Sequence, residues 1–401
     1  MSEKNKETLK PGWRRVKFGD VVQLSKVRSQ DPLADGYERY VGLEHLEPGD
    51  LRIRSWGNVA DGVTFTSVFR TGQVLFGKRR AYQRKVAVAD FAGVCSGDIY
   101  VLETKDAKVL LPELLPFICQ TDAFFDHAVG TSAGSLSPRT NWSLLSEYGF
   151  SLAPVDAQIG ILEAFSAAER ARQAALDLRE STNRMLVSAL TELYTRGTRS
   201  KSLISTAIGL VPGDWEVTAL GEKYEVQLGK KLYNEFTEGD GQVPYLRNAN
   251  VQWNRLDLVD VATMTFSERE KSLYLLRPGD ILACEGRHVG KAALWGSEIP
   301  DACYQMALHR LRPKRTDQVP SFLLHCLRYY SISGRFKAVT GETTIPHLPA
   351  EAFKKMLFPF PPANEQLEIA DAIDAVYAVI DQSDKRANAA AEVLRSLSSA
   401  M

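Results

Sequence analysis

Residues 154–193 read PVDAQIGILEAFSAAERARQAALDLRESTNRMLVSALTEL, and residues 362–401 read PANEQLEIADAIDAVYAVIDQSDKRANAAAEVLRSLSSAM. Each stretch begins with proline, has glutamine four residues later, and continues without another proline through residues that favour helices. We predict a long helix at each place, with bounds at 154–197 and 362–401. From Asp156 to Leu193 the first helix would be about 57 Å long at 1.5 Å per residue.

Small and apolar residues recur along both stretches in steps of three and four, the spacing of a coiled-coil seam. Counting from Ile161, and from Ile369 at a shift of 208, gives one seam of small residues and one of larger residues. Because a small seam lets a larger one approach closely, we predict that the two helices pair antiparallel. The alternative is that each stripe packs only on its own domain. The predicted seam positions are Ile161, Ala164, Ala168, Ala171, Ala175, Leu178, Met185 and Ala189 on the first helix, and Ile369, Ala372, Val376, Val379, Ala390, Val393 and Leu397 on the second.

The segments that precede the two helices also repeat each other. Trp13 recurs as Trp215, and residues 72–75 (GQVL) recur as residues 279–282 (GDIL). A period of about 205 residues indicates a duplicated domain and not a solenoid of short repeats. Short β-branched and aromatic runs, broken by glycine, proline and asparagine, predict strands with helices among them.

We therefore predict an α+β protein. Two globular mixed α/β domains in a pseudo-two-fold repeat would be separated by two long helices that form an antiparallel coiled coil. The domains would cover residues 1–153 and 211–361, and a linker at 198–210 would lead from the first helix to the second domain.

The composition is that of an ordinary globular protein, with 44% hydrophobic and 24% charged residues among 401. The formal net charge is zero, so any nucleic-acid partner must be bound by local basic patches. Five cysteines without a CxxC pair are typical of buried thiols in a reducing cytosol, and not of a disulfide framework or a zinc site. No run approaches 18 apolar residues and the first ten residues lack an apolar signal core, so we expect a cytoplasmic protein without a membrane segment.

Catalytic motifs are weak throughout the chain. Residues 130–134 (GTSAG) have the spacing of a serine-nucleophile elbow, but residues 135–138 (SLSP) follow where the elbow needs a helix. The turn at 286–292 approaches a phosphate-binding loop, but it is one residue short between its glycines and has Ala292 where serine or threonine must hold Mg²⁺. The six histidines have no metal-ligand spacing. We therefore expect no enzyme activity, no metal and no cofactor on this chain, and the competing hypothesis is a hydrolase that uses Ser132.

Donor-rich turns at matched places in the two copies are the strongest functional signal. Residues 78–85 (KRRAYQRK) have five positive charges and an aromatic ring, which suits phosphates and guanine edges. The matching turn at 285–291, the polar loop before each long helix, and residues 245–250 (YLRNAN) also offer arginine, asparagine and hydroxyl donors. Taken singly, each segment also has the composition of a solvated loop, but together they predict DNA binding. The candidate DNA-binding residues are Lys78, Arg79, Arg80, Tyr82, Arg84, Lys85, Ser135, Ser137, Arg139, Arg247, Asn248, Asn250, Arg287, His288, Lys291, Thr343, Thr344 and His347.

These features together resemble the specificity subunits of type I restriction–modification systems. Residues 278–291 (PGDILACEGRHVGK) resemble that family's Gly-Asp-Ile/Leu-Leu turn with its later glycines and lysine. Residues 340–348 (TGETTIPHL) resemble its Thr-Gly…Ile-Pro-x-Leu segment, and residues 358–366 (FPFPPANEQ) resemble the entry to its conserved helix. The first copy departs from the pattern, since residues 155–158 (VDAQ) lack the glutamate and residues 135–137 (SLS) replace the Ile-Pro step.

The resemblance implies a non-catalytic subunit whose two target-recognition domains read one asymmetric, bipartite sequence in double-stranded DNA. The two helices would act as a spacer, two methyltransferase (modification) subunits would dock on the chain, and two restriction (translocase) subunits would lie outside them. S-adenosylmethionine, ATP and Mg²⁺ would be bound by those partners. Two alternatives stay open: a stand-alone two-domain DNA-binding regulator without a methyltransferase, and a coiled-coil adaptor whose domains bind protein.

Overall fold

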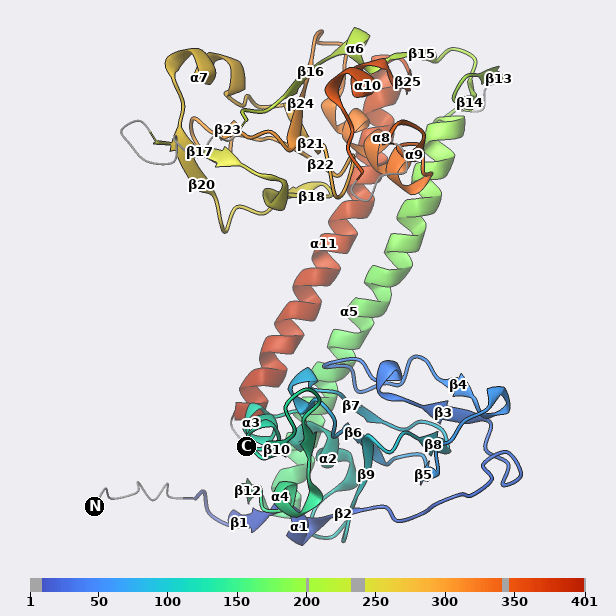
Figure 1. Ribbon diagram of the computed structural model, residues 1–401, viewed down its shortest axis with the longest axis vertical. Coiled ribbons are helices and arrows are strands. Elements are labelled where there is room, and N and C mark those ends of the chain that lie inside the picture. Colours follow the sequence, from blue (N-terminus) through green and yellow to red (C-terminus); the bar gives the residue numbers. More distant parts are fainter. Residues whose placement is uncertain (1–8, 200–201, 232–241, 341–345, 400–401) are drawn as a thin grey trace. The chain divides into compact units, whose positions relative to one another are not determined.

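The computed structural model describes residues 9–199, 202–231, 242–340 and 346–399, which divide between two compact units (Figure 1). The first unit comprises Met1–Leu176 and Asp384–Met401, and the second comprises Asp177–Ser383. Each unit therefore takes one part of each long helix, which differs from the linear order of domains predicted above. The predicted domain boundaries stay predictions.

The two long helices are α5 (Val155–Arg196) and α11 (Ala363–Ser399). Helix α5 is followed by Gly197, whose φ of 72° is the left-handed conformation that glycine adopts directly after a helix. The predicted linker at 198–210 contains more order than expected, because β13 (Leu203–Thr206) and β14 (Gly209–Pro212) form an antiparallel hairpin there.

The long helices pack against each other inside each unit. In the first unit, Phe165 of α5 lies in a buried cluster against which Leu394 and Leu397 of α11 pack. In the second unit, Leu190 of α5 shares a buried cluster with Ile369 of α11. The early part of α5 thus meets the late part of α11, and the late part of α5 meets the early part of α11. The antiparallel pairing expected from the sequence is confirmed.

The predicted seam has one of its two rows in the wrong place. One row of the predicted seam is buried or half-buried: Ile161, Ala168, Ala175 and Ala189 of α5, and Ile369, Val376, Ala390 and Leu397 of α11. The other row is exposed: Ala164, Ala171, Leu178 and Met185 of α5, and Ala372, Val379 and Val393 of α11. The residue that follows each exposed position turns inward on most turns, as with Phe165, Leu186 and Ile373. The observed steps are four then three, where the prediction used three then four.

The bulk of the side chains explains this shift of one residue. Phe165 stands next to Ala164, and Ile373 stands next to Ala372, so turning the later residue inward buries more apolar surface. Counting alone does not distinguish the two phases, because alanines occupy both rows along α5. We name the exposed row, residues 164, 171, 178 and 185 of α5 with 372, 379 and 393 of α11, the outer row.

The first unit contains two four-stranded sheets, and helix α5 helps to close its core. Its shorter elements are β1 (Arg14–Lys17), α1 (Phe18–Val21), β2 (Val22–Leu24), β3 (Arg39–Val41), β4 (Gly57–Asn58), β5 (Ser67–Phe69), β6 (Val74–Gly77), β7 (Val86–Val88), β8 (Gly93–Cys95), β9 (Ile99–Thr104), α2 (Leu115–Ile118), α3 (Asp122–Gly130), β10 (Ser132–Ala133), β11 (Arg139–Thr140), α4 (Trp142–Leu145) and β12 (Gly149–Leu152). One sheet has the order β2-β9-β6-β7 and the other has the order β4-β3-β8-β5. Strand β1 pairs with β12, which leads directly into α5.

The second unit repeats this plan. Its shorter elements are β15 (Glu216–Ala219), α6 (Leu220–Lys223), β16 (Tyr224–Leu228), β17 (Gln242–Leu246), β18 (Val251–Gln252), β19 (Arg255–Leu256), β20 (Ala262–Thr265), α7 (Glu268–Tyr274), β21 (Ile281–Cys284), β22 (Ala292–Leu294), β23 (Cys303–Tyr304), β24 (Leu308–Pro313), α8 (Pro320–Ile332), α9 (Lys337–Thr340), α10 (Ala350–Lys355) and β25 (Leu357–Phe360). The order β16-β24-β21-β22 matches β2-β9-β6-β7, and the β15–β25 pair matches β1–β12.

One glutamine near the start of each long helix fixes the same junction in both units. The Oε1 atom of Gln158 accepts from Leu111 N at 3.0 Å, and the Oε1 atom of Gln366 accepts from Val319 N at the same distance. Both glutamines are buried, and both also donate to a backbone carbonyl just before their helix. The duplication inferred from sequence therefore extends to individual hydrogen bonds.

Two general findings complete the fold. Within the described ranges, no helix has the length and apolar character needed to cross a membrane. All five cysteines are free thiols and buried.

Candidate nucleic-acid interface

In the first unit, the fold brings two of the sequence-predicted DNA-binding segments together. The β6–β7 hairpin presents residues 78–85 at its turn, and the loop 134–138 joins β10 to β11. Thr140 N donates to Lys78 O at 2.9 Å, and Arg80 N donates to Pro138 O at 2.7 Å. Segments that lie about 60 residues apart in the chain thus form one surface, which we call the first reading surface.

Three guanidinium groups on this surface are held by two small acceptors. Asp98 accepts from Arg139 Nε at 2.8 Å and from Arg79 at 3.3 Å. The Ser137 hydroxyl oxygen accepts from Arg79 at 3.2 Å and from Arg80 at 3.3 Å. Burial alone would raise the pKa of Asp98, but hydrogen bonds and charge from Arg139 and Arg79 outweigh it and hold that pKa below its usual range. Because one carboxylate pairs with only two of the three guanidiniums, the surface keeps a positive charge while its arginines are oriented in advance.

Two of the predicted residues in this turn have structural partners. Arg84 pairs with Asp122 at 2.6 Å and lies over the ring of Phe125, and Lys85 donates to Leu43 O at 2.6 Å. These contacts fasten the turn to α3 and to the short 3-10 helix Leu43–His45 that follows β3. Arg84 and Lys85 are therefore engaged inside the unit and are less available to a partner.

The other predicted residues of the first unit lie on or beside the reading surface. Lys78 Nζ lies 4.8 Å from the centre of the Tyr100 ring. Tyr82 is 56% exposed at the turn, and Ser135 is exposed in the loop. These side chains can contact a backbone or a base without first breaking an internal ion pair.

The second unit repeats the arrangement with different side chains. Leu348 N donates to Glu285 O at 2.8 Å, the counterpart of the bond between Thr140 and Lys78. Gly286 forms a β-bridge with His347, and the Asn248 side chain donates to Gly286 O at 3.0 Å. We call this turn, with its neighbouring loop, the second reading surface.

Arg287 and His288 are both exposed at the turn of this second surface. Lys291 lies at the base of the turn, where its Nζ donates to the side chain of Gln252 at 3.2 Å. Thr343 and Thr344, which were predicted to bind DNA, lie outside the described residues.

The segment 245–250 supplies support more than free donors. Asn250 is 3% exposed, and its amide donates to Asp257 O and Asp260 O while its Oδ1 accepts from Arg247 N at 2.8 Å. Arg247 pairs with Asp260 at 2.7 Å. The prediction that Asn250 contacts bases is therefore wrong, since its amide is fully used inside the unit. Sequence composition alone does not distinguish an asparagine that braces a turn from one that reads a base.

The hydrolase hypothesis loses its geometric basis. Ser132 lies in β10, and the chain turns back into β11 without the helix that a nucleophile elbow requires. The Ser132 hydroxyl donates to Ala128 O at 2.7 Å and lies 2.9 Å from Thr140 Oγ1. Among the described residues there is no cluster of three or more potential metal ligands.

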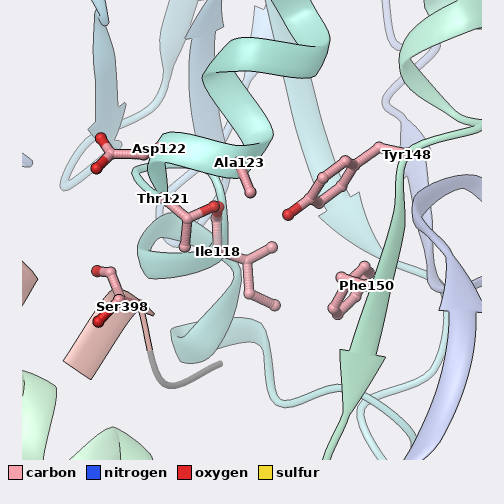
Figure 2. A pocket seen from close by; sticks show the side chains of 8 residues that line it. Ile118, Thr121, Asp122, Ala123, Tyr148, Phe150 and Ser398 are labelled. Atoms are coloured by element: carbon pink, nitrogen blue, oxygen red, sulfur yellow. The ribbon is translucent and has the colours of Figure 1, made fainter. Parts of the chain in front are cut away.

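A hollow of about 270 Å³ in the first unit is a packing difference and not a second site (Figure 2). Figure 2 shows Thr121, Asp122 and Ser398 of α11 on one side, and Tyr148 and Phe150 on the other. At the shift of 208 that aligns the two glutamine junctions, Thr121 and Asp122 correspond to Tyr329 and Tyr330, and Phe150 corresponds to Phe358. In the second unit Tyr330 stacks on Phe358, with 4.4 Å between the ring centroids.

Asp98 is the part of the first reading surface that sequence reasoning missed. It lies between β8 and β9, far in sequence from Arg79 and Arg139, and belongs to no recognisable motif. The other missed feature is the backbone of Arg80 and Arg287, which both have positive φ. The two arginines occupy equivalent positions when the sequences of the two turns are aligned. The residue types around them do not reveal their backbone conformation.

Comparison with known proteins supports the same resemblance over part of the chain. The sequence model of the type I restriction modification DNA specificity domain matches residues 212–392. Residues 212–392 are similar to a type I DNA specificity domain. The resemblance inferred from the turn and helix-entry motifs is thereby confirmed.

Curated relatives and solved structures agree with this assignment. The EcoDI specificity subunit of Escherichia coli is 28% identical over 241 residues, which are 56% of this chain and 51% of that protein, so the chain spans about half the length of this relative. The MjaVIII specificity subunit of Methanocaldococcus jannaschii is 22% identical over 389 residues, covering 92% of this chain and 87% of that protein.

The similarity to solved structures shows that the fold is shared. The type I system S subunit from M. genitalium superposes with a TM-score of 0.61 at 15% identity, covering 99% of this chain and 98% of that chain. A chain from work on complex assembly and conformational transition of the type I R-M system gives a TM-score of 0.56 at 20% identity, covering 98% and 97%.

Proposed function

We propose that this chain is the DNA-specificity subunit of a cytoplasmic type I restriction–modification complex, and that each reading surface binds one half of a bipartite target. The observation that carries the proposal is the repeated junction of hairpin and loop, marked by the bond from Thr140 to Lys78 in one unit and from Leu348 to Glu285 in the other. A two-stranded hairpin of this kind fits the major groove, where each base pair presents a distinct pattern of donors and acceptors.

The two half-sites should differ in sequence, because the two surfaces differ in chemistry. The first surface presents three arginines and a serine, which suit phosphates and guanine edges. The second presents one arginine with two histidines and an asparagine engaged with its turn. An asymmetric target with an unread spacer follows from this difference.

We assign the part of the outer row that lies in the second unit, Leu178 and Met185 of α5, to a contact with a methyltransferase subunit. Leu178 is 42% exposed and Met185 is 53% exposed, although they stand seven residues apart, the spacing of a helix-packing row. Apolar side chains at that spacing favour a further helix packed along them. The partners would supply S-adenosylmethionine, ATP and Mg²⁺ chemistry, and restriction subunits would bind outside them.

Co-purification with sequencing of modified DNA tests this function directly. The chain should purify with a stoichiometric methyltransferase subunit from its host, and its deletion should abolish methylation at one bipartite motif. Triple replacement of Lys78, Arg79 and Arg80 by alanine should weaken DNA binding of the assembled complex and reduce its salt dependence, since phosphate contacts release counterions. Sequence-specific DNA binding without any methyltransferase would instead support the stand-alone regulator, and DNA affinity unchanged by the triple variant would support the protein-binding adaptor.

The spacer role of the helices has its own test. Inserting seven residues into both α5 and α11 keeps their seam in register and lengthens each by about 10 Å. The preferred distance between half-sites should then grow by about three base pairs at 3.4 Å each. An insertion in α5 alone should disrupt the pairing, and an unchanged half-site distance after the double insertion would contradict the spacer role.

A further inference from the structure

Arg80 and Arg287 occupy the same place in two separate hairpins. Each is the third residue after a buried strand, since β6 ends at Gly77 and β21 ends at Cys284. Their φ angles are 54° and 60°, so both have the left-handed backbone conformation. The surrounding sequence differs between the turns, yet both turns have arginine at this position.

The left-handed conformation makes arginine an unexpected choice. Glycine adopts it without a steric penalty, whereas a side chain with a Cβ atom crowds the neighbouring carbonyl oxygen. Nothing in the turn geometry therefore requires arginine in place of glycine. When a residue with unfavourable backbone geometry recurs at equivalent places, we take its side chain, and not its backbone conformation, to be the reason for its presence there.

The surroundings of Arg80 hold its side chain in a defined position without using all its donors. Its backbone N donates to Pro138 O at 2.7 Å, and one terminal nitrogen donates to Ser137 Oγ at 3.3 Å. Its Nε is buried and has no hydrogen-bond partner among the described residues. Arg79 and Arg139 beside it are both paired with Asp98, so Arg80 is the arginine of this surface that lacks a carboxylate partner in the described part of the chain.

The surroundings of Arg287 differ, but its place does not. It is exposed, and the residue before it, Gly286, is bridged to His347 of the neighbouring loop. A Cβ atom on Gly286 would lie 3.1 Å from the His347 ring, so the loop packs closely on the turn just before the arginine. The loop thus steadies the turn from which Arg287 projects.

We infer that Arg80 and Arg287 are the paired specificity residues, each reading one guanine by its major-groove edge, with one in each half of the target. The inference rests on the proposed function and adds which residue of each surface discriminates bases. Arginine suits this task because its planar fork gives two parallel hydrogen bonds to guanine O6 and N7. Arg79 and Arg139, tied to Asp98, position the surface on phosphates instead.

Glycine variants separate recognition from folding. Arg80→Gly and Arg287→Gly keep the left-handed turn, so the melting temperature should stay within about 4 °C of the wild type, because relief of crowding and a looser unfolded chain offset each other. Ser297→Gly is the matched control, since Ser297 has a φ of 77° but lies in the loop between β22 and β23, outside both reading surfaces. Arg80→Lys retains the charge and loses the fork.

The readout is genome-wide methylation by the complete complex that contains each variant. Arg80→Gly should relax discrimination at one guanine of one half-site by roughly 5- to 150-fold, and Arg287→Gly should do the same in the other half-site. Arg80→Lys should lose the same discrimination while keeping salt-dependent DNA affinity. Ser297→Gly should leave the motif unchanged.

Three results would overturn the inference. If either glycine variant methylates the wild-type motif with full discrimination, that arginine does not read a base, although the proposed function stands. If both variants relax the same half-site, the assignment of one arginine to each half is wrong. If the wild-type complex itself methylates no bipartite motif, the proposed function and the inference fail together, and the wild-type measurement alone reveals this failure.

Discussion

The register of the helix pair makes a prediction that one pair of neighbouring residues can test. Leu186 is 3% exposed and lies in the core of the second unit, whereas Met185, one residue earlier, is 53% exposed. Leu186→Ala should therefore destabilise the protein, and Met185→Ala should not. The two substitutions shorten apolar side chains on the same turn of the same helix, so helix propensity changes little between them.

The size of the effect follows from the burial. Leu186→Ala removes three buried carbon groups at about 0.8 kcal/mol each, or about 2.4 kcal/mol of transfer free energy. The cavity left behind adds to this, since buried Leu→Ala changes in other proteins cost about 2.7–5.0 kcal/mol. At about 2–4 °C per kcal/mol for a unit of this size, the melting temperature should fall by roughly 5–20 °C. Met185→Ala should change stability by less than about 0.5 kcal/mol.

Differential scanning calorimetry of the purified chain measures both changes, and co-purification provides a second readout. If Met185 belongs to the outer row that binds a partner, Met185→Ala should weaken retention of the methyltransferase subunit while leaving the melting temperature in place. Equal destabilisation by the two variants would refute the four-then-three register. Destabilisation by Met185→Ala alone would restore the three-then-four register predicted from sequence.

Three further predictions concern single side chains. Asp98→Asn removes the carboxylate that holds Arg79 and Arg139, so the complex should bind non-specific DNA more tightly and discriminate its target less. The slope of log K against log salt should become steeper by the equivalent of about one to two phosphate contacts, which titrations at several salt concentrations measure. An unchanged slope would count against Asp98 as the anchor. Burial lowers the pKa of His309 from 6.5 to about 4, so the unfolded chain takes up a proton below about pH 6.5 while the folded chain stays neutral until about pH 4. As the pH is lowered from about 6.5 to about 4, the free energy of unfolding should therefore fall by about 3 kcal/mol. Urea titrations across this range measure the fall, and His309→Gln should make the free energy of unfolding less dependent on pH. Gln366→Ala leaves Val319 N and Pro361 O without their side-chain partner in a buried junction and should cost about 2–4 kcal/mol by urea unfolding, whereas the exposed neighbour Leu367→Ala should cost less than about 1 kcal/mol.

Sequence indicated the long helices and their antiparallel pairing because both depend on local composition and on a regular period. Proline at the start of α11 and glycine after α5 mark helix ends by their backbone chemistry alone. The phase of the seam was missed because it depends on which neighbour is larger at each turn, as with Phe165 and Ala164. Periodicity counts positions and does not weigh side chains against the partner that must accommodate them.

The candidate site was predictable where it rests on the repeat and unpredictable where it rests on tertiary contacts. Aligning the two copies of the sequence is enough to match Arg80 with Arg287. The anchoring of Arg79 by Asp98, and the internal use of the Asn250 amide, arise only when segments distant in sequence meet. A polar residue in a turn looks the same in sequence whether it faces a ligand or braces the fold.

The exchange of helix segments between the units has a consequence for synthesis on the ribosome. Leu394 and Leu397, which pack against the core of the first unit, are translated after the whole of the second unit. The 221 residues from Asp177 to Leu397 take roughly 10–45 seconds to make at 5–20 residues per second. Throughout that interval the core cluster that contains Phe165 must do without the cover of Leu394 and Leu397, so we expect the first unit to reach its full stability only after translation ends.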